Sequence, residues 1–515
     1  MKLIRKYLLE VISFPLLLIT FFATRLTNLM SLPIFTDEAI YTRWAQIAKQ
    51  DSNWRFISLT DGKQPSFIWA ESFMMKFVED PLLSGRLVSV FSGLLVCVGI
   101  YFLTREIFSK EKNVRWISIS ALIFTVFFPF LLVYDRLAIY ESMTAAFFVW
   151  ALYLQVLLVR RLRLDVAMIL GFVLGGAVLT KSSGFLSIYL TPFLLILIDL
   201  SKKTIKSKII KFGLLAVVSA CIAYAMYSIQ RLSPFFHIID QKNSIFVHPV
   251  SEWLSFPIKL KLEIIESNFR GLSNWFFIYF NPINMALVIA SFVIFRKYLK
   301  EKALLLIWFV LPFIALCVFG KTLYPRYILF MVLPLIPLVA NAVVKIFEKY
   351  KNYVLRACLI LTISAVPIWM INSIIFNFQN SPIPRSDLEQ FINGWPSGGG
   401  VKESVEFFKN ESKKGPIFIA TQGTFGLMPY SYEIYLDSNE NVTVKGYWPT
   451  NDLIPEDVLE VAKNMPTYFV FYQDCHVCET TAVAPKTWPL ELIQSYKKGT
   501  GKTKLNIYKV IPVKE

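Results

Sequence analysis

The stretch Ser31-Leu-Pro-Ile-Phe-Thr-Asp-Glu-Ala-Ile-Tyr41 places two adjacent acids shortly after an apolar N-terminal run. The run extends from about Tyr7 to Ala23 without a small-x-small cleavage site, so we interpret it as an uncleaved membrane span rather than a signal peptide. Asp37 and Glu38 therefore stand at a membrane edge. Two acids at such a place can supply a catalytic base, a cation ligand or the start of a helix.

The composition is that of a polytopic membrane protein. Of 515 residues, 55% are hydrophobic, and the mean hydropathy is +0.52, far above the values typical of a soluble domain. The net charge of +17 raises the alternative of nucleic-acid binding. The basic residues, however, flank apolar runs, where they set membrane orientation, instead of forming one patch. We therefore expect the lipid bilayer, and no nucleic acid, as a partner.

Eleven apolar segments approach the length of about 20 residues that a helix needs to cross a bilayer. The fifth and sixth are short, and their glycines together with Lys181-Ser-Ser-Gly184 could make them one irregular hairpin, so ten to thirteen spans fit the sequence. The segments lie at approximately 8–28, 83–104, 116–134, 138–159, 164–180, 185–200, 212–230, 273–295, 303–320, 328–344 and 354–376.

Loop charges predict the orientation, because cytoplasmic loops collect Lys and Arg. With a cytoplasmic N-terminus, all six inside segments are basic, and the outside connections near 134–138, 181–184 and 320–327 hold few cations. An odd number of spans then places everything after about residue 377 outside, in a multi-pass protein of the cell membrane. The inside cations are Lys2, Arg5, Lys6; Arg105, Lys110, Lys112, Arg115; Arg160, Arg161, Arg163; Lys202, Lys203, Lys206, Lys208, Lys211; Arg296, Lys297, Lys300, Lys302; and Lys345, Lys349, Lys351, Arg356.

Two long outside loops are expected to carry helices along the membrane surface. In the first loop, 30–82, apolar residues recur at helical spacing over 38–49 and 65–78. The second loop, 231–272, is expected to be partly ordered and to end in an amphipathic helix. It is our candidate for a mobile lid.

The composition changes after the last span, which divides the chain into a membrane domain at 1–376, a linker at 377–400 and an outside α/β domain at 401–515. Three prolines and Gly398-Gly-Gly400 mark the linker. In the domain, strand-like and helix-like runs alternate. The strands are expected at 416–420, 442–447, 467–472 and 504–511, and the helices at 401–412 and 455–464.

Polar residues of both charge signs gather at the outer ends of the predicted spans. A charge at the bilayer centre costs about 2.5 to 3.5 kcal/mol on insertion scales, so such residues face a cavity or the interface. Any one of them can be an interfacial anchor or a local ion pair, but five separate segments contribute to one membrane face. The set is Asp37 and Glu38; Asp61 and Lys63; Asp135, Arg136 and Glu141; Lys181; and Lys321, Arg326 and Tyr327.

Acids and cations at one membrane edge suit a reaction between a lipid-linked phosphate and a second substrate. Arg and Lys hold phosphate oxygens by charge-assisted bonds, and a carboxylate can take the proton of an attacking hydroxyl. Fixed cations also stabilise the charge of a departing phosphate. The alternative is a transporter or flippase, which predicts charged or helix-breaking positions near mid-bilayer and a repeat between halves. We find neither in the sequence.

Six motifs in order resemble the GT-C membrane glycosyltransferases, in particular family 39, the protein O-mannosyltransferases, and the related lipid A aminoarabinose transferases. The similarity covers about residues 1–345. One departure is Gly62, which stands where the aminoarabinose transferases have an acid. The motifs are Phe35-Thr-Asp-Glu-Ala-Ile-Tyr41, Lys63-Gln-Pro-Ser-Phe-Ile-Trp69, Gly85-Arg-Leu-Val-Ser89, Asp135-Arg-Leu-Ala-Ile-Tyr-Glu-Ser142, Gly171 to Lys181, and Pro325-Arg-Tyr-Ile-Leu329.

The resemblance implies an α-helical GT-C fold of about 11 transmembrane helices, with juxtamembrane helices in the first outside loop. It also implies the inverting transfer of one sugar from a polyprenyl-phosphate donor to an extracytoplasmic protein, lipid or glycan acceptor. No cofactor is expected, and a divalent metal is not required by the family, though it stays an open alternative. Sugar identity, prenol length, acceptor and oligomeric state do not follow from the resemblance.

The resemblance also implies residue roles. Asp37 would be the catalytic base and Glu38 would position acceptor or donor. Glu141 would orient Arg136 or shape the sugar pocket. The donor phosphate would be bound by Arg136, Lys181, Arg326 and Lys63, with Asp61 and Tyr327 as further positioning residues.

Cys475-His-Val-Cys478 could be a disulfide, half of a metal site or a redox pair. A structural zinc site needs four ligands, and the sequence has no second Cys/His cluster, which favours the disulfide. His237 and His248 are interpreted as ordinary loop residues.

Overall fold

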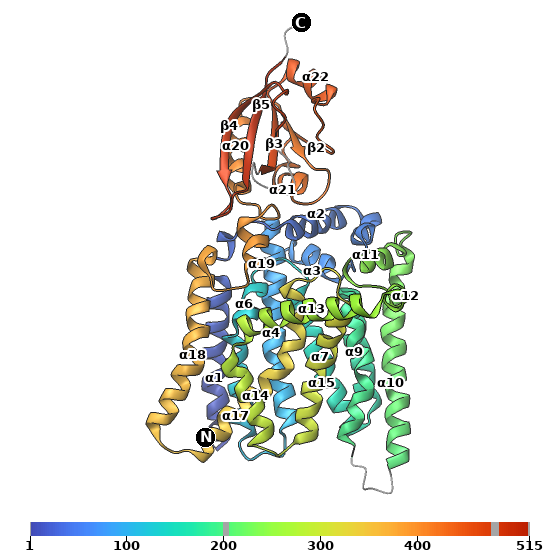
Figure 1. Ribbon diagram of the computed structural model, residues 1–515, viewed down its shortest axis with the longest axis vertical. Helices are drawn as coiled ribbons and strands as arrows, with labels where there is room; N and C mark the ends of the chain where they lie inside the picture. The colour runs from blue at the N-terminus through green and yellow to red at the C-terminus, as the bar shows by residue number, and fades with distance from the viewer. Residues whose placement is uncertain (1, 199–204, 475–483, 513–515) are drawn as a thin grey trace.

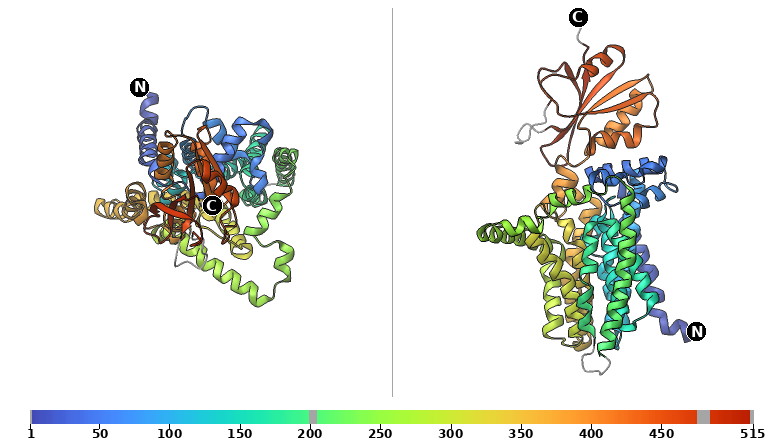
Figure 2. Two further views of the ribbon diagram at one scale, coloured as in Figure 1. Left: turned by 90° about the horizontal axis from the view of Figure 1, so that it is seen from above. Right: turned by 90° about the vertical axis from the view of Figure 1, so that its right-hand side faces the viewer.

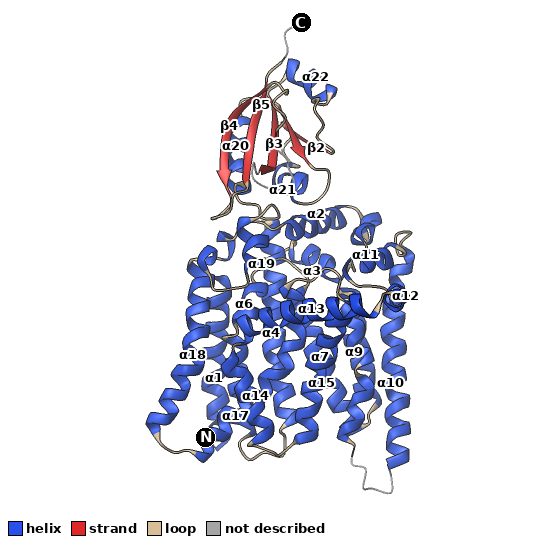
Figure 3. Cartoon of the chain, viewed as in Figure 1, coloured by secondary structure: helices blue, strands red, loops and turns tan. Residues whose placement is uncertain are grey.

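The computed structural model describes residues 2–198, 205–474 and 484–512. A long bundle of helices carries a small sheet domain on one end, and the N-terminus lies at the opposite end of the bundle (Figure 1). Helices dominate the chain, with strands confined to the end domain (Figure 3). The predicted fold class, a polytopic helical protein with a C-terminal α/β domain, is confirmed.

Within the described ranges, seven helical stretches are long and apolar enough to cross a membrane, and two bent helix pairs raise the number to nine. The pair α5 (Val114–Val126) and α6 (Pro129–Asp135) bends by 54°. The seven are Leu9–Ser31 with α1 (Lys2–Leu26), α4 (Pro81–Ile107), α7 (Glu141–Arg161), Ile205–Leu232 with α10 (Ile205–Ser228), α15 (Leu299–Phe319), Pro325–Lys349 with α16 (Leu329–Val332) and α17 (Ile336–Lys349), and α18 (Tyr353–Phe376).

These nine match nine of the eleven apolar segments predicted from the sequence, and the other two are shorter apolar helices. The two remaining segments form α8 (Leu164–Thr180) and a broken helix at Ser182–Leu197 that includes α9 (Phe185–Tyr189). The chain reverses so tightly between them that a β-carbon at Gly184 would collide with the Ala177 carbonyl oxygen. These are the two segments whose glycines and Lys181 break made them ambiguous in the sequence.

The predicted span at 273–295 is not one straight helix. It contains the end of α13 (Ile258–Phe280) and all of α14 (Pro282–Val293), which meet at 92°. Asn281 has a positive φ and Pro282 opens the next helix, so the first helix cannot continue through this point. As a result, α13 lies across the bundle and projects from it (Figures 1 and 2).

An outer layer of short helices separates the bundle from the sheet domain (Figure 1). It contains α2 (Thr36–Gln50) and α3 (Ser66–Met74), which match the two helices predicted in the first outside loop. The loop expected to be only partly ordered forms α11 (Ile238–Phe246) and α12 (Val250–Ser255) before α13, whose amphipathic character was predicted. Asp37 and Glu38 occupy the first turn of α2, where negative charge favours the helix.

The C-terminal domain is a five-stranded sheet in the order β2-β1-β3-β5-β4, with β1 to β3 parallel and β5 antiparallel to β3 and β4. Alternate residues of its central strands pack on opposite faces, against α20 and α21 on one and α22 on the other. The sequence predicted all of these elements except α21 and β4. The elements are α20 (Val401–Glu411), β1 (Ile417–Gln422), α21 (Leu427–Leu436), β2 (Val442–Tyr447), α22 (Glu456–Asn464), β3 (Thr467–Asp474), β4 (Leu490–Lys497) and β5 (Lys504–Val510).

The segment predicted as a linker, 377–400, is folded and packed against the bundle. Buried Asp387 accepts hydrogen bonds from the hydroxyl groups of Tyr134 and Tyr279, at 3.0 and 2.5 Å. Further along, the Thr36 backbone N–H donates to the Pro396 carbonyl at 2.9 Å. The connection therefore fixes the sheet domain to the start of α2.

The sheet domain also contacts α2 directly through α21. Arg43 lies 2.8 Å from Glu433 and 3.0 Å from Asp437, and the Gln46 amide donates to the Ile434 carbonyl. The Arg43 side chain is only 12% exposed, so this ion pair is less screened by water than a pair on the open surface.

We expect the Arg43–Glu433 pair to hold α2 and α21 together. In a double-mutant cycle of Arg43→Ala and Glu433→Ala, the coupling free energy measured by unfolding in detergent should be about 1 kcal/mol. The exposed pair Glu266–Arg270 within α13 serves as the control and should give a coupling near zero. Equal couplings for the two pairs would contradict the assignment.

Candidate active site

A cavity of about 440 Å³ lies where the outer layer meets the bundle. Its charged lining comes from the outer layer and from the outer ends of bundle helices, whereas α9 and α15 contribute apolar side chains. The charged residues that line it are Asp37, Lys63, Glu141, Lys181, Lys242 and Arg326, and the apolar ones include Phe185, Leu186, Leu316, Phe319 and Phe330. The cavity therefore joins a charged region to an apolar one.

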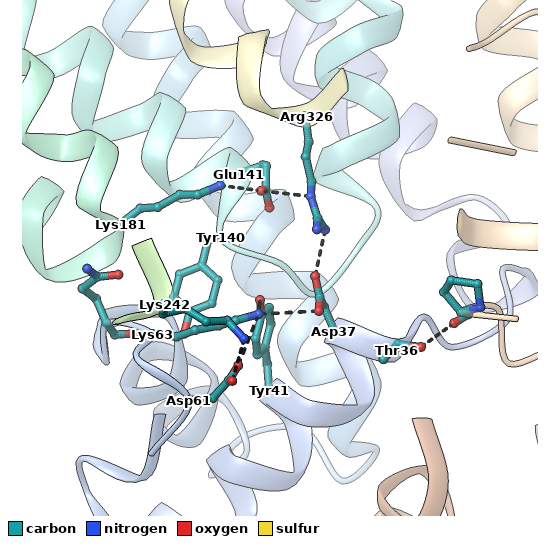
Figure 4. Close-up of polar contacts among 12 residues, drawn as sticks. Thr36, Asp37, Tyr41, Asp61, Lys63, Tyr140, Glu141, Lys181, Lys242 and Arg326 are labelled. Atoms are coloured by element: carbon teal, nitrogen blue, oxygen red, sulfur yellow. Dashed lines mark hydrogen bonds and ion pairs between the residues drawn. The ribbon is translucent and has the colours of Figure 1, made fainter. Parts of the chain in front are cut away.

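Asp37 faces the cavity from the first turn of α2 and is held by two cations (Figure 4). Its Oδ2 accepts a hydrogen bond from Arg326 Nη1 at 2.8 Å, and its Oδ1 lies 3.6 Å from Lys63 Nζ. Lys63 also donates to the Tyr41 hydroxyl, one turn further along α2, at 2.7 Å. The carboxylate is thus fixed in place but keeps 16% of its side chain exposed.

A second group of charges lies beside the first. Lys181 Nζ donates to Glu141 Oε1 at 2.8 Å, and the same oxygen lies 3.8 Å from Arg326 Nε. Lys181 also lies over the Tyr327 ring, at 4.7 Å. Arg326 therefore bridges Asp37 and Glu141, and the three predicted cations Lys63, Lys181 and Arg326 surround one space (Figure 4).

The cations control the proton affinity of Asp37. Burial alone would raise the pKa of its carboxyl, but Lys63 and Arg326 outweigh burial and lower the pKa to about 2. Burial also lowers the pKa of Lys63, against the opposing effect of Asp37 and Asp61. In this arrangement Asp37 is ionised at any physiological pH but is a weak base.

Glu38 does not face the cavity, contrary to the predicted positioning role. It is fully buried, and its carboxylate accepts hydrogen bonds from Arg86 Nε and Nη2 at 2.9 and 3.0 Å and from the backbone N–H groups of Phe35 and Ala138. All of its contacts are within the fold. It follows Asp37 in the helix, so the two side chains point about 100° apart around the axis.

Arg136 does not line the cavity, so this arrangement does not support its predicted contact with the donor phosphate. Its guanidinium is buried and donates to the backbone carbonyls at the end of the first span, those of Thr24, Arg25, Thr27 and Asn28. The last carbonyls of a helix have no hydrogen-bond donors within the helix, and the Arg136 guanidinium serves as their donor. Glu141 pairs with Lys181 and Arg326 rather than with Arg136, which leaves its other predicted role, shaping the pocket.

Asp61 and Tyr327 lie at the site in different ways. Asp61 is 4.0 Å from Lys63 and 2.6 Å from Lys242 of α11. Tyr327 lines the cavity beneath Lys181. Asp135, also noted in the sequence, is buried and paired with Arg25 at 3.2 Å, which places it in the structural framework.

Tyr41, Gln64, Tyr140 and Lys242 are among the lining residues that the sequence did not single out. Tyr41 and Tyr140 belong to motifs that we quoted, but aromatic residues at helical spacing are more often core. Gln64 donates to Ser182 Oγ at 2.7 Å and so ties the Lys63 loop to the Lys181 loop. Lys242 was one cation in a long polar loop, and no motif indicated that it would reach the cavity.

Among the residues that the structure describes, no three His, Cys, Asp or Glu side chains gather as metal ligands. His248, just before α12, lies 3.2 Å from Glu252 inside that helix, and His237 contacts the Pro234 carbonyl. Cys475 and Cys478 lie outside the described residues, so their pairing stays a prediction.

Comparisons with known proteins give a partial match to a family model and show the fold. A family model described as dolichyl-phosphate-mannose-protein mannosyltransferase matches residues 63–227. A search of curated proteins finds no match. The structure is similar to that of ArnT from Cupriavidus metallidurans bound to undecaprenyl phosphate, with a TM-score of 0.54 and 13% identity, over 98% of both chains. The chain has the GT-C fold.

A second GT-C structure is similar over most of the chain. It is the archaeal oligosaccharyltransferase AglB from Archaeoglobus fulgidus in complex with an inhibitory peptide and a dolichol-phosphate. The TM-score is 0.51 and the identity 13%, over 91% of this chain and 69% of that one. The GT-C fold implied by the six motifs is thereby confirmed.

We expect Glu38 to act in folding and not in chemistry. Glu38→Gln should destabilise the protein by about 3 to 5 kcal/mol, because it leaves the buried Arg86 charge without its partner. Asp37→Asn, which changes a partly exposed neighbour, is the matched control and should unfold near the wild-type temperature. A Glu38→Gln protein of normal stability that had lost its activity would contradict this assignment.

Proposed function

We propose that the protein is a glycosyltransferase that moves a single sugar from a polyprenyl-phosphate donor to a hydroxyl acceptor on the outer side of the membrane. The observation that carries the proposal is the cavity, which places a carboxylate among cations next to an apolar wall. No nucleotide sugar is needed, because the site lies at the membrane end opposite the N-terminus, which the loop charges assign to the cytoplasm.

The cavity suits an amphipathic donor. Lys63, Lys181 and Arg326 can bind the oxygens of one phosphate by charge-assisted hydrogen bonds. The side chains of α9 and α15 offer an apolar surface to a prenyl chain, which is costly to leave in water. The solved relatives support this class of ligand, since ArnT was bound to undecaprenyl phosphate and AglB to a dolichol-phosphate.

The proposed reaction is a direct displacement. Asp37 takes the proton of the acceptor hydroxyl, and the hydroxyl oxygen forms a bond to the anomeric carbon of the donor sugar. The bond between that carbon and the phosphate oxygen breaks, and the phosphate leaves with the electron pair. Lys63, Lys181 and Arg326 stabilise the new charge on the phosphate. One base and one displacement invert the anomeric centre.

Donor binding would also strengthen the base. In the empty site Arg326 and Lys63 are committed to Asp37, and this lowers its pKa to about 2. When a phosphate shares these cations, their effect on Asp37 weakens and burial, which favours the protonated form, gains weight. The carboxylate would then accept a proton more readily only after the donor has entered.

We expect Asp37→Asn to abolish transfer while the donor still binds. Loss of a general base costs about 10²- to 10⁴-fold in rate, whereas the three cations remain in the variant. The assay uses the purified full chain with radiolabelled polyprenyl-phosphate sugars and a panel of acceptors. Asp51→Asn is the matched control, because Asp51 ends the same helix and lies outside the cavity lining.

Two results would contradict the proposal in different ways. Normal transfer by Asp37→Asn would remove the base assignment. Failure of the wild type to transfer sugar from any of the donors, together with its uptake of a lipid-linked substrate into liposomes, would favour the transporter alternative.

The pH dependence should separate the empty enzyme from the donor complex. Because the pKa of Asp37 is lowered, the carboxylate is present at neutral pH and is lost only as the pH falls toward about 2. The profile of kcat/KM for the donor reports the free enzyme, so it should have no acidic limb from Asp37 above pH ~4. The profile of kcat at saturating donor should show that limb at higher pH. If the acidic limbs of the two profiles coincided, the donor would not change the pKa of Asp37.

A further inference from the structure

Lys242 is a fourth cation at the cavity, contributed by α11 and outside the motifs. Its Nζ lies 2.6 Å from Asp61 Oδ1, and its side chain also lines the cavity. Lys63 also reaches Asp61, with its Nζ 4.0 Å from Asp61 Oδ2, so the two lysines share this carboxylate (Figure 4). About 23% of the Lys242 side chain is exposed, so it is held but not enclosed.

Gly62 explains how α11 comes so close. The residue has a φ of +65°, in the left-handed region that favours glycine. A β-carbon here would lie 2.6 Å from both the Ile238 carbonyl oxygen and Lys242 Cβ. Any side chain at position 62 would therefore push α11 away. The glycine that departs from the related motif and the lysine on α11 belong to one arrangement.

Lys242 also sets the charge of the site. The cavity and its border hold four cations, Lys63, Lys181, Lys242 and Arg326, and three carboxylates, Asp37, Asp61 and Glu141, which leaves a net charge of +1. Without Lys242 the cations and carboxylates would balance. A sugar phosphodiester carries one negative charge, so the lysine supplies the positive charge that the donor would neutralise.

We propose that Lys242 is a ligand of the donor phosphate, held by Asp61 while the site is empty and shared with the phosphate when the donor binds. This proposal rests on the proposed function. Its rival is a purely structural pair in which Lys242 and Asp61 only hold α11 against the loop before Lys63. A flexible lysine can exchange one oxygen ligand for another over a few ångströms, so the geometry suits the exchange.

Binding measurements on two variants, one without the Lys242 cation and one without the Asp61 carboxylate, distinguish a phosphate ligand from a structural ion pair. Undecaprenyl phosphate is titrated into the purified full chain in nanodiscs, with undecaprenol, which lacks the phosphate, as the ligand control. Lys242→Gln removes the cation, whereas Asp61→Asn removes its resting partner and leaves the cation. Lys259→Gln is the matched control, because Lys259 is an exposed lysine of the neighbouring α13 outside the cavity lining.

Lys242→Gln should weaken binding of undecaprenyl phosphate by about 10- to 100-fold, the value of one hydrogen bond to a charged group, and leave undecaprenol binding unchanged. Asp61→Asn should bind the phosphate as well as the wild type or more tightly. Equal losses in both variants would establish the structural pair and overturn the proposal, as would no loss in Lys242→Gln. A wild type that does not prefer the phosphate to the prenol would overturn the proposed function itself.

Discussion

The buried ion pair between Glu38 and Arg86 is the contact on which the outer layer depends. Arg86 belongs to α4, and its guanidinium donates to Glu38 and also to the carbonyls of Leu29, Leu32 and Pro33. Glu38 in turn accepts from the Ala138 backbone in the turn before α7. One pair therefore joins the end of the first span, the start of α2 and the start of α7. A buried pair of this kind is costly to break, because either partner alone is an uncompensated charge.

The geometry of the charged cavity follows from that framework. Asp37 is fixed because the next residue is locked to α4, and Glu141 is fixed because it follows the turn that Glu38 binds. Arg326 comes from a distant part of the chain and meets both acids, at 2.8 Å and 3.8 Å. The sheet domain adds a further restraint, since Pro396 binds the Thr36 backbone and α21 binds Arg43. The C-terminal domain thus contributes to the position of the carboxylate, although none of its described residues lines the cavity.

Much of this could be predicted from the sequence, and the failures have physical causes. Apolar length located each candidate membrane segment among the described residues, and strand-like runs located four of the five strands of the sheet. Hydropathy does not report a 92° bend at Asn281 or a reversal at Gly184, so the shape of these two regions was not predicted. Membrane side was a sound guide to the site, since Asp37, Lys63, Lys181 and Arg326 do converge. The side of the membrane does not tell a residue that lines the cavity from one buried in the fold. The predicted site therefore included Glu38 and Arg136, which are buried away from the cavity lining.

That distinction depends on what else each side chain meets. Arg136 and Arg326 are both arginines at the outer ends of helices, yet the first meets four carbonyls at the end of a span and the second meets two carboxylates at a cavity. Carbonyls without helical partners will hold any guanidinium within reach, and a guanidinium so occupied has little left for a substrate. Arg326 lies among aromatic rings, and its polar partners in the structure are the carboxylates of Asp37 and Glu141, whose attraction a phosphate can match. The cations that can bind a substrate phosphate are therefore those that pair with acidic side chains in the empty site. Lys242, which pairs with Asp61, meets this condition in the same way as Lys63, Lys181 and Arg326.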